Sequence, residues 1–90
     1  MSQPTFDLYL KPGCPWCTKA TSWLDAEGFT YEAHDVIADP AKFAEMKQLT
    51  GQTLAPNLRV RVEGGDDLVL ADFGPEELEA FIEKHGLAPA

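Results

Sequence analysis

The sequence has few cysteines, few basic residues and no long hydrophobic segment. Its 90 residues include two cysteines, and 15 acidic residues outnumber 7 basic ones, giving a net charge of −8. Small proteins stabilised by disulfides carry many more cysteines, so that class is excluded. No apolar run approaches the roughly 20 residues that span a membrane. The acidic balance disfavours nucleic acid as a partner, because its phosphates would be repelled.

No targeting signal is predicted at the start of the given sequence. Met1-Ser2-Gln3-Pro4 contains no basic region followed by a long apolar run, so no secretory signal is predicted. We therefore expect a reducing, cytoplasmic location without membrane attachment. The chain length corresponds to one domain, predicted over residues 1–90, with a modest core of its own.

Both cysteines lie in one short motif, Lys11-Pro12-Gly13-Cys14-Pro15-Trp16-Cys17. The motif joins an apolar run at residues 6–10 to a helical pattern at residues 15–26. A Cys-x-x-Cys pair between a strand and a helix is typical of a dithiol redox site. In a reducing compartment, a lone cysteine pair is more often catalytic or metal-binding than structural.

The spacing of the motif predicts different roles for the two cysteines. Pro15 suits the first helical position, because its missing N–H would have no partner there. Cys14 then becomes the N-cap, where free backbone N–H groups and the helix dipole favour the reactive thiolate. Lys11 adds a positive charge nearby. Cys17 lies one turn further on, shielded and within reach of Cys14, so we expect Cys14 to attack and Cys17 to resolve.

Two other uses of the cysteine pair fit the sequence less well. A zinc site needs three or four ligands, and the other candidates, His34 and His85, are isolated in sequence, so no metal site is predicted. A structural disulfide that closes so short a loop would restrain little of the unfolded chain.

Hydrophobic periodicity predicts seven elements in the order β-α-β-α-β-β-α. The predicted strands are residues 5–10, 29–36, 57–62 and 68–72. The predicted helices cover residues 15–26, the segment from Pro40 to Gly51, and the segment from Gly74-Pro75 to Gly86. A strand–helix–strand series implies a parallel pair with a right-handed crossover. The turn Glu63-Gly64-Gly65-Asp66 makes the last two strands an antiparallel hairpin.

The same patterns place individual side chains. In the first strand, one face carries Phe6, Leu8 and Leu10, and the other carries Asp7 and Tyr9. In the second, Phe29, Tyr31 and Ala33 share a side. Outside the strands, Trp16 is expected to be exposed and Trp23 to be packed. His34 is expected to be an ordinary surface histidine, and the buried stripe of the last helix is expected to be Leu78, Phe81, Ile82 and His85.

Arg59 and Arg61 alternate with apolar residues in the third predicted strand. A strand buried on both faces would be almost wholly apolar, so we expect one face of this strand to be partly covered. The arginines then either reach carboxylates such as Asp7 or face solvent at an edge.

The segment Gln52-Thr53-Leu54-Ala55-Pro56 is the second informative stretch. A proline directly before a strand is compatible with a cis peptide bond. It also leaves the preceding backbone unpaired at a strand end, available to an incoming chain. Downstream of a Cys-x-x-Cys unit, this arrangement favours a substrate-binding role.

With a dithiol after the first strand and a proline opening the third, the chain resembles the glutaredoxins of the thioredoxin-like superfamily over essentially its whole length. The segment from Tyr9 to Cys17 is close to the family's site, which usually contains Cys-Pro-Tyr-Cys. The family's Thr-Val-Pro falls on Leu54-Ala55-Pro56. Its Gly-Gly-Cys-Asp-Asp falls on Phe73-Gly74-Pro75-Glu76-Glu77, where the match is partial. The resemblance implies an α/β fold with a four-stranded mixed sheet of order 2-1-3-4. The first and last helices would cover one face and the second helix the other.

The resemblance also implies a glutathione site. Lys11, helped by Gln52, would meet the glycine carboxylate of glutathione. The backbone of Ala55, beside a cis-Pro56, would pair with its cysteine unit as an added strand. Trp16 would lie against the bound molecule.

At the other end of that site, the start of the last helix, at Gly74, would receive the γ-glutamyl carboxylate. Glu76 would hold the ammonium group, where the family usually has aspartate. Two departures affect this end of the site: Pro75 has no N–H to donate, and Phe73 replaces a glycine.

The function that the resemblance implies is a glutathione-dependent thiol–disulfide oxidoreductase. It would act as a monomer on disulfide-containing or glutathionylated proteins, with glutathione as co-substrate and no tightly bound cofactor. Phe73-Gly74-Pro75 also resembles the glutaredoxin-like electron donors of ribonucleotide reductase, which are reduced by thioredoxin reductase and bind glutathione poorly. Their dithiol usually lacks the proline and the aromatic residue found here.

Two alternatives belong to other functional classes. Monothiol relatives hold an iron–sulfur cluster between two subunits with glutathione as co-ligand, and Cys14 could supply a thiolate. Pro15 and the second cysteine, Cys17, argue against this role. The other alternative is a disulfide-sensing adaptor without turnover.

Overall fold

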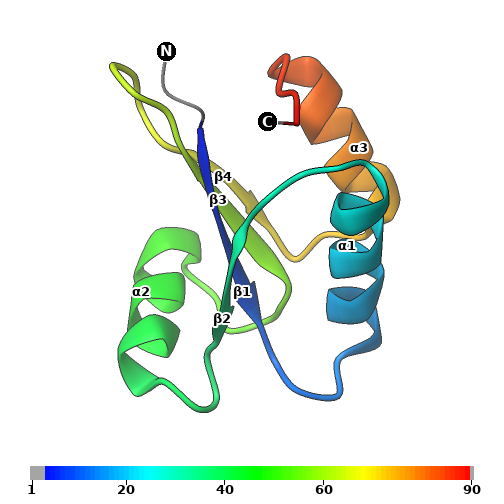
Figure 1. Ribbon diagram of the computed structural model, residues 1–90. Helices are drawn as coiled ribbons and strands as arrows, with labels where there is room; N and C mark the ends of the chain where they lie inside the picture. The colour runs from blue at the N-terminus through cyan, green and yellow to red at the C-terminus, as the bar shows by residue number, and fades with distance from the viewer. Residues whose placement is uncertain (1–3, 90) are drawn as a thin grey trace.

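The computed structural model describes residues 4–89; residues 1–3, on which the signal-sequence prediction depends, and residue 90 lie outside this range. The seven elements follow the predicted order (Figure 1). They are β1 (Thr5–Leu10), α1 (Pro15–Ala26), β2 (Glu32–Asp35), α2 (Pro40–Thr50), β3 (Asn57–Arg61), β4 (Leu68–Ala71) and α3 (Pro75–Lys84).

The four strands form one mixed sheet in the order β2-β1-β3-β4. β1 pairs in parallel with β2 and antiparallel with β3, and β4 is antiparallel to β3. α1 and α3 lie together on one face of the sheet, and α2 lies on the other (Figure 1). The thioredoxin-like α/β fold and the strand order implied by the resemblance are thus confirmed.

The core consists of two apolar clusters, one on each face of β1. Phe6 and Leu8 belong to the larger cluster, which packs under α1 and α3 with Leu24 and Leu78. Tyr9, which points to the opposite face, packs with Val36 and Met46 beneath α2. The period-two alternation predicted for β1 is therefore confirmed.

Each helix begins where the sequence predicts, with a proline in its first turn. At α2, the Asp39 Oδ1 atom accepts hydrogen bonds from the N–H groups of Ala41 and Lys42 at 3.1 and 3.4 Å. Gly51 ends this helix with a φ of 69°, in the left-handed region that glycine adopts without a steric cost. Proline and cap residues thus fix the helix starts.

The prediction of a strand over residues 29–36 is wrong at its start, because β2 begins at Glu32. The Phe29 N–H donates to the Leu24 carbonyl at 2.9 Å, so this segment still belongs to the end of α1. Phe29 is buried by stacking on Phe6 and Trp23. Ala33, expected on the same side as Phe29, is exposed. The aromatic alternation therefore reflects a buried loop followed by a short edge strand.

Smaller corrections concern other element ends. The third and fourth strands end at Arg61 and Ala71, one residue earlier than predicted. His85, predicted on the buried stripe of α3, is exposed at the helix C-cap and contacts only the edge of that stripe through the Phe81 ring, with centroids 4.7 Å apart. Among the described residues, no helix is long and apolar enough to cross a membrane.

Candidate active site

Cys14 occupies the N-cap of α1 on the turn that follows β1. Gly13 makes the turn with a φ of 74°, and Pro15 takes the first helical position. Cys14 has an extended backbone, and its Sγ accepts a hydrogen bond from the Cys17 N–H at 3.2 Å. This N–H and the positive end of the helix dipole both stabilise negative charge on sulfur. The partly exposed Cys14 is thus placed to act as a nucleophile.

Cys17 lies one turn further along α1 and is buried, with 4% of its surface exposed. Burial, assisted by the neighbouring Cys14 sulfur, raises the pKa of the Cys17 thiol to about 11. Both cysteines are free thiols. The pair therefore combines an accessible sulfur held by a helix terminus with a shielded sulfur that stays protonated at neutral pH.

The loop before β3 lies against the dithiol. The Ala55–Pro56 peptide bond is cis, and the Ala55 carbonyl oxygen lies 3.9 Å from the Cys14 Sγ. The Lys11 Nζ donates a hydrogen bond to the Thr53 carbonyl at 2.5 Å. The predicted Lys11, Cys14, Ala55 and Pro56 are thus brought together.

The Gln52 side chain stabilises this loop through hydrogen bonds to other residues of the same segment. Its Nε2 donates to the Asn57 Oδ1 at 2.8 Å, and its Oε1 accepts from the Leu54 N–H. Both ends of the Gln52 amide therefore make hydrogen bonds within the loop.

Asn57 is a site residue that the sequence analysis missed. Its buried side chain donates to the Leu54 carbonyl at 2.6 Å and also accepts from the Asp72 N–H at 3.0 Å. Asn57 thus fastens the loop beside Cys14 to the segment that precedes α3. The one signal in the sequence was a poor strand former at the first position of a buried strand.

Trp16 and the start of α3 form the other side of the site. Trp16 is 52% exposed, as predicted, and its ring lies over Gly74. A Cβ atom on Gly74 would lie 3.0 Å from the Trp16 ring, so a larger residue here would require the ring to shift by a few tenths of an ångström. The Gly74 N–H donates to the Glu77 Oε2 at 3.2 Å. Glu76 is exposed in the first turn of the helix.

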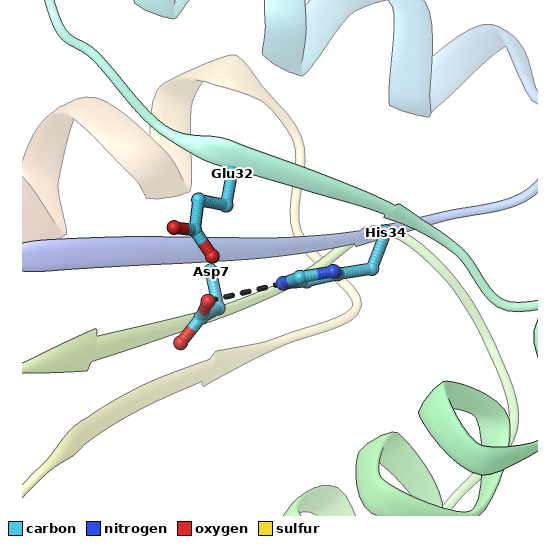
Figure 2. A group of neighbouring side chains, drawn as sticks. All are labelled: Asp7, Glu32 and His34. Atoms are coloured by element: carbon cyan, nitrogen blue, oxygen red, sulfur yellow. Dashed lines mark hydrogen bonds and ion pairs between the residues drawn. The ribbon is translucent and has the colours of Figure 1, made fainter.

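The prediction of His34 as an ordinary surface residue is wrong, because its side chain is 14% exposed and its Nε2 lies 3.0 Å from Asp7 Oδ1. Asp7, His34 and Glu32 project from neighbouring strands on the sheet face that α2 partly covers (Figure 2). Arg61 donates to both Asp7 oxygens, at 2.7 and 2.9 Å. Of the two alternatives left open for this arginine, the structure shows the contact with Asp7.

This polar cluster is separate from the dithiol and is held together by ion pairs. Glu32, Asp7 and His34 could in principle offer ligand atoms to a metal, since these lie within 4.8 Å of one another. However, both Asp7 oxygens already accept hydrogen bonds from the Arg61 guanidinium, whose positive charge opposes a cation. Arg59 likewise pairs with Asp67, at 2.8 Å, and with Glu45, at 3.4 Å. We assign the cluster a structural role.

Comparison with known proteins identifies the family. A family model described as Glutaredoxin matches residues 7–64, a range that includes both cysteines and Pro56. The chain belongs to the glutaredoxin family. Membership, together with the free Cys14–Cys17 pair, makes this glutaredoxin-family chain a protein of the thiol–disulfide oxidoreductase type. The match ends before α3, so Gly74 and its neighbours lie outside it.

Individual relatives agree with this assignment. A glutaredoxin of Neisseria meningitidis is 42% identical over 55 residues, which cover 60% of this chain and 65% of the relative. A hybrid peroxiredoxin of Haemophilus influenzae is 29% identical over 69 residues, which cover 73% of this chain and 28% of that longer protein. The chain thus spans less than two thirds of both relatives.

Solved structures agree in fold. The glutaredoxin of Archaeoglobus fulgidus superposes with a TM-score of 0.68 at 18% identity, covering 88% of this chain and 86% of that one. A buckwheat glutaredoxin, solved as a complex with glutathione, superposes with a TM-score of 0.60 at 21% identity, covering 92% and 71%. Both likenesses extend over most of this chain and concern its fold.

Proposed function

We propose that this glutaredoxin-family chain reduces protein disulfides and glutathione mixed disulfides, with glutathione as its reductant. The observation that carries the proposal is the position of Cys14. Its partly exposed sulfur sits at a helix N-cap, 3.2 Å from the Cys17 N–H, and beside the backbone of Ala55. A thiolate favoured there attacks disulfides at neutral pH, where an ordinary thiol is mostly protonated.

The reaction on a protein disulfide has two exchange steps. The Cys14 thiolate attacks one sulfur of the substrate disulfide, forming a mixed disulfide and releasing the other sulfur as a thiolate that takes up a proton. Cys17 then loses its proton and attacks the Cys14 sulfur. The substrate leaves as a dithiol, and Cys14 and Cys17 are oxidised to a disulfide. Two glutathione molecules reduce this disulfide and become glutathione disulfide.

On a glutathionylated protein, the first step leaves glutathione bonded to Cys14. A second glutathione then attacks the glutathione sulfur, so the Cys14 thiolate is regenerated without Cys17. This difference between the two reactions separates the roles of the cysteines.

The proposed glutathione site begins at Lys11. The glycine carboxylate would take the place of the Thr53 carbonyl as an acceptor for the Lys11 Nζ. The peptide groups of glutathione would then pair with the backbone of Ala55, next to Pro56. Gln52 supports the shape of this loop through Asn57 and Leu54, so we assign it a positioning role.

The γ-glutamyl end of glutathione would reach Trp16 and the start of α3, at Gly74 and Glu76. The buckwheat relative that binds glutathione shares the fold on which this placement rests. We propose the cytoplasm as the place of action, because the cysteine pair needs a reducing compartment to be regenerated.

One observation favours a second candidate, an electron donor reduced by thioredoxin reductase. The Gly74 N–H is taken by Glu77, and Pro75 has no N–H, so two donors that could bind a glutathione carboxylate are missing from the first turn of α3. A reductase that supplies electrons directly to the Cys14–Cys17 disulfide would not need those donors.

The two candidates predict opposite results in a paired reduction assay. The oxidised protein is mixed with a protein disulfide and NADPH, with either glutathione and glutathione reductase or thioredoxin reductase alone. We expect NADPH consumption to be at least about tenfold faster with glutathione, because Lys11 and the Ala55 loop remain available for it. Cys14→Ser serves as the blank. Faster turnover with thioredoxin reductase would support the electron donor instead, and no turnover with either would reject both.

A further inference from the structure

Negative charge surrounds the part of the site between Trp16 and α3. A hollow of about 140 Å³ is lined by Trp16, Asp72, Phe73, Gly74 and Glu77, with two carboxylates and no cation among them. An adjoining hollow of about 380 Å³ is lined by Trp16, Lys19, Pro75, Glu76 and Glu77. Trp16 belongs to both, two residues beyond Cys14, so any substrate held on Cys14 that extends toward α3 enters this region.

Glu77 has a defined position in this region. Its Oε2 atom accepts a hydrogen bond from the Gly74 N–H, at 3.2 Å. If residue 74 carried a Cβ atom, that atom would lie 3.1 Å from the same oxygen. The Trp16 ring lies over the same glycine. The Glu77 carboxylate therefore occupies the place where a ligand carboxylate would otherwise meet the first turn of α3. An incoming anion meets like charge there instead of a free N–H.

One basic side chain faces the same region. The Lys19 Nζ lies 4.3 Å from the centre of the Trp16 ring, on the side of the second hollow. Its single positive charge is outnumbered by the three carboxylates of Asp72, Glu76 and Glu77, which line the same two hollows. The local charge therefore remains negative, in a protein that is itself acidic.

We propose that Glu77 is a specificity-determining residue, which makes this site prefer peptide disulfides with a cationic side chain next to the reacting cysteine over those with an anionic one. The proposal rests on the proposed function, because it concerns the partner of Cys14. Lys11 attracts the carboxyl-terminal side of such a peptide, so the residue that precedes its cysteine lies toward Trp16 and Glu77. Lysine or arginine fits there, whereas a carboxylate is repelled.

The test uses three acetylated tripeptides that differ only in the residue before cysteine: acetyl-Arg-Cys-Gly, acetyl-Gln-Cys-Gly and acetyl-Glu-Cys-Gly. Each is joined through its cysteine to thionitrobenzoate in a mixed disulfide. In a Cys17→Ser background, the Cys14 thiolate attacks the peptide sulfur, the S–S bond breaks, and yellow thionitrobenzoate leaves as the better leaving group. The rate of its release measures a single step.

We expect the arginine peptide to react about tenfold faster than the glutamate peptide, with the glutamine peptide between them, at low ionic strength. Glu77→Gln is expected to reduce this ratio to about threefold or less. The glutamine keeps an oxygen that can accept the Gly74 N–H, so the helix start is preserved. Reaction of both proteins with the thionitrobenzoate disulfide of mercaptoethanol, in which the half that replaces the peptide is uncharged, should agree within about twofold, which checks that Cys14 is intact.

The matched control is Glu79→Gln, which removes the same charge from an exposed position on α3 that lines neither hollow. It should leave the tenfold ratio in place. Equal rates for the three peptides, or an equal loss of discrimination in Glu79→Gln, would overturn the proposal. No release of thionitrobenzoate from any disulfide would instead reject the proposed function, so the two failures are distinguishable.

Discussion

Replacing Cys14 by serine is expected to abolish both disulfide reduction and deglutathionylation, lowering each rate by about 10³-fold or more. Serine keeps the N-cap hydrogen bond from the Cys17 N–H but cannot form a disulfide. Replacing Cys17 by serine is expected to have a divided effect. Protein disulfide reduction should fall by a similar factor, because the mixed disulfide has no resolving thiol, whereas deglutathionylation should persist within about threefold.

Both reactions are measured on each variant, one with a protein disulfide and one with a glutathionylated protein, using glutathione and its reductase. Urea unfolding of the variants checks that each is folded, since Cys17 is buried and its replacement affects packing. Loss of deglutathionylation in a folded Cys17→Ser protein would contradict the assigned roles, as would residual activity in Cys14→Ser.

Replacing Asp7 by asparagine is expected to lower the free energy of unfolding by about 2–3 kcal/mol at pH 7. Asp7 is 1% exposed and accepts hydrogen bonds from Arg61, at 2.7 and 2.9 Å, and from His34, at 3.0 Å. Asparagine keeps the size of the side chain but loses its charge and one acceptor. The expected loss is at the low end for a buried ion pair because Arg61 is half exposed and can be solvated.

The same contacts give this stabilisation a pH dependence. Burial alone would raise the pKa of Asp7, but the hydrogen bonds from Arg61 and His34 and their charges outweigh it, so the pKa lies below its ordinary value. A carboxyl whose pKa is depressed by folding stabilises the protein above its unfolded pKa, and this stabilisation is lost as the pH falls through the folded value. The difference between the wild type and Asp7→Asn should therefore be full above about pH 5 and shrink below about pH 4.

Urea unfolding of both proteins between pH 3 and pH 7 measures this difference. Asp67→Asn is the control, because it breaks an ion pair with Arg59 at a partly exposed carboxylate and should cost about 0.5 kcal/mol or less. If Asp7→Asn were no more destabilising than Asp67→Asn, the buried ion pair would not have the stabilising role assigned to it.

The reactive half of the site could be predicted from the sequence because its geometry is local. Pro15 and the helical pattern after it place Cys14 at the N-cap. The Cys14 sulfur accepts its hydrogen bond from the N–H of Cys17, three residues away. The helix starts at Asp39 and Gly74 follow from the same local rules. Such contacts depend on spacing along the chain, which the sequence displays directly.

The errors occurred where tertiary contacts decide the structure. Phe29 alternates with Tyr31 as in a strand, yet its backbone closes the end of α1 and its ring fills the core. His34 meets Asp7 only because of the register between β2 and β1. Asn57 joins two loops through hydrogen bonds to residues up to 15 positions away. Hydrophobic periodicity describes the faces of a single helix or strand, so it cannot predict which residues of other elements a side chain contacts.

The central claim is that the α1 N-cap makes Cys14 the reactive thiolate, whereas burial keeps Cys17 protonated. Its most direct test is alkylation of the reduced protein at pH 7 with less than one equivalent of iodoacetamide, with the modified residue located by fragment mass spectrometry. A thiol of pKa about 11 is ionised at pH 7 in only about one molecule in 10⁴. We expect the label on Cys14 alone, with a rate above that of the same residue in the urea-unfolded chain. Labelling of Cys17 first, or a Cys14 that reacts no faster folded than unfolded, would contradict the claim.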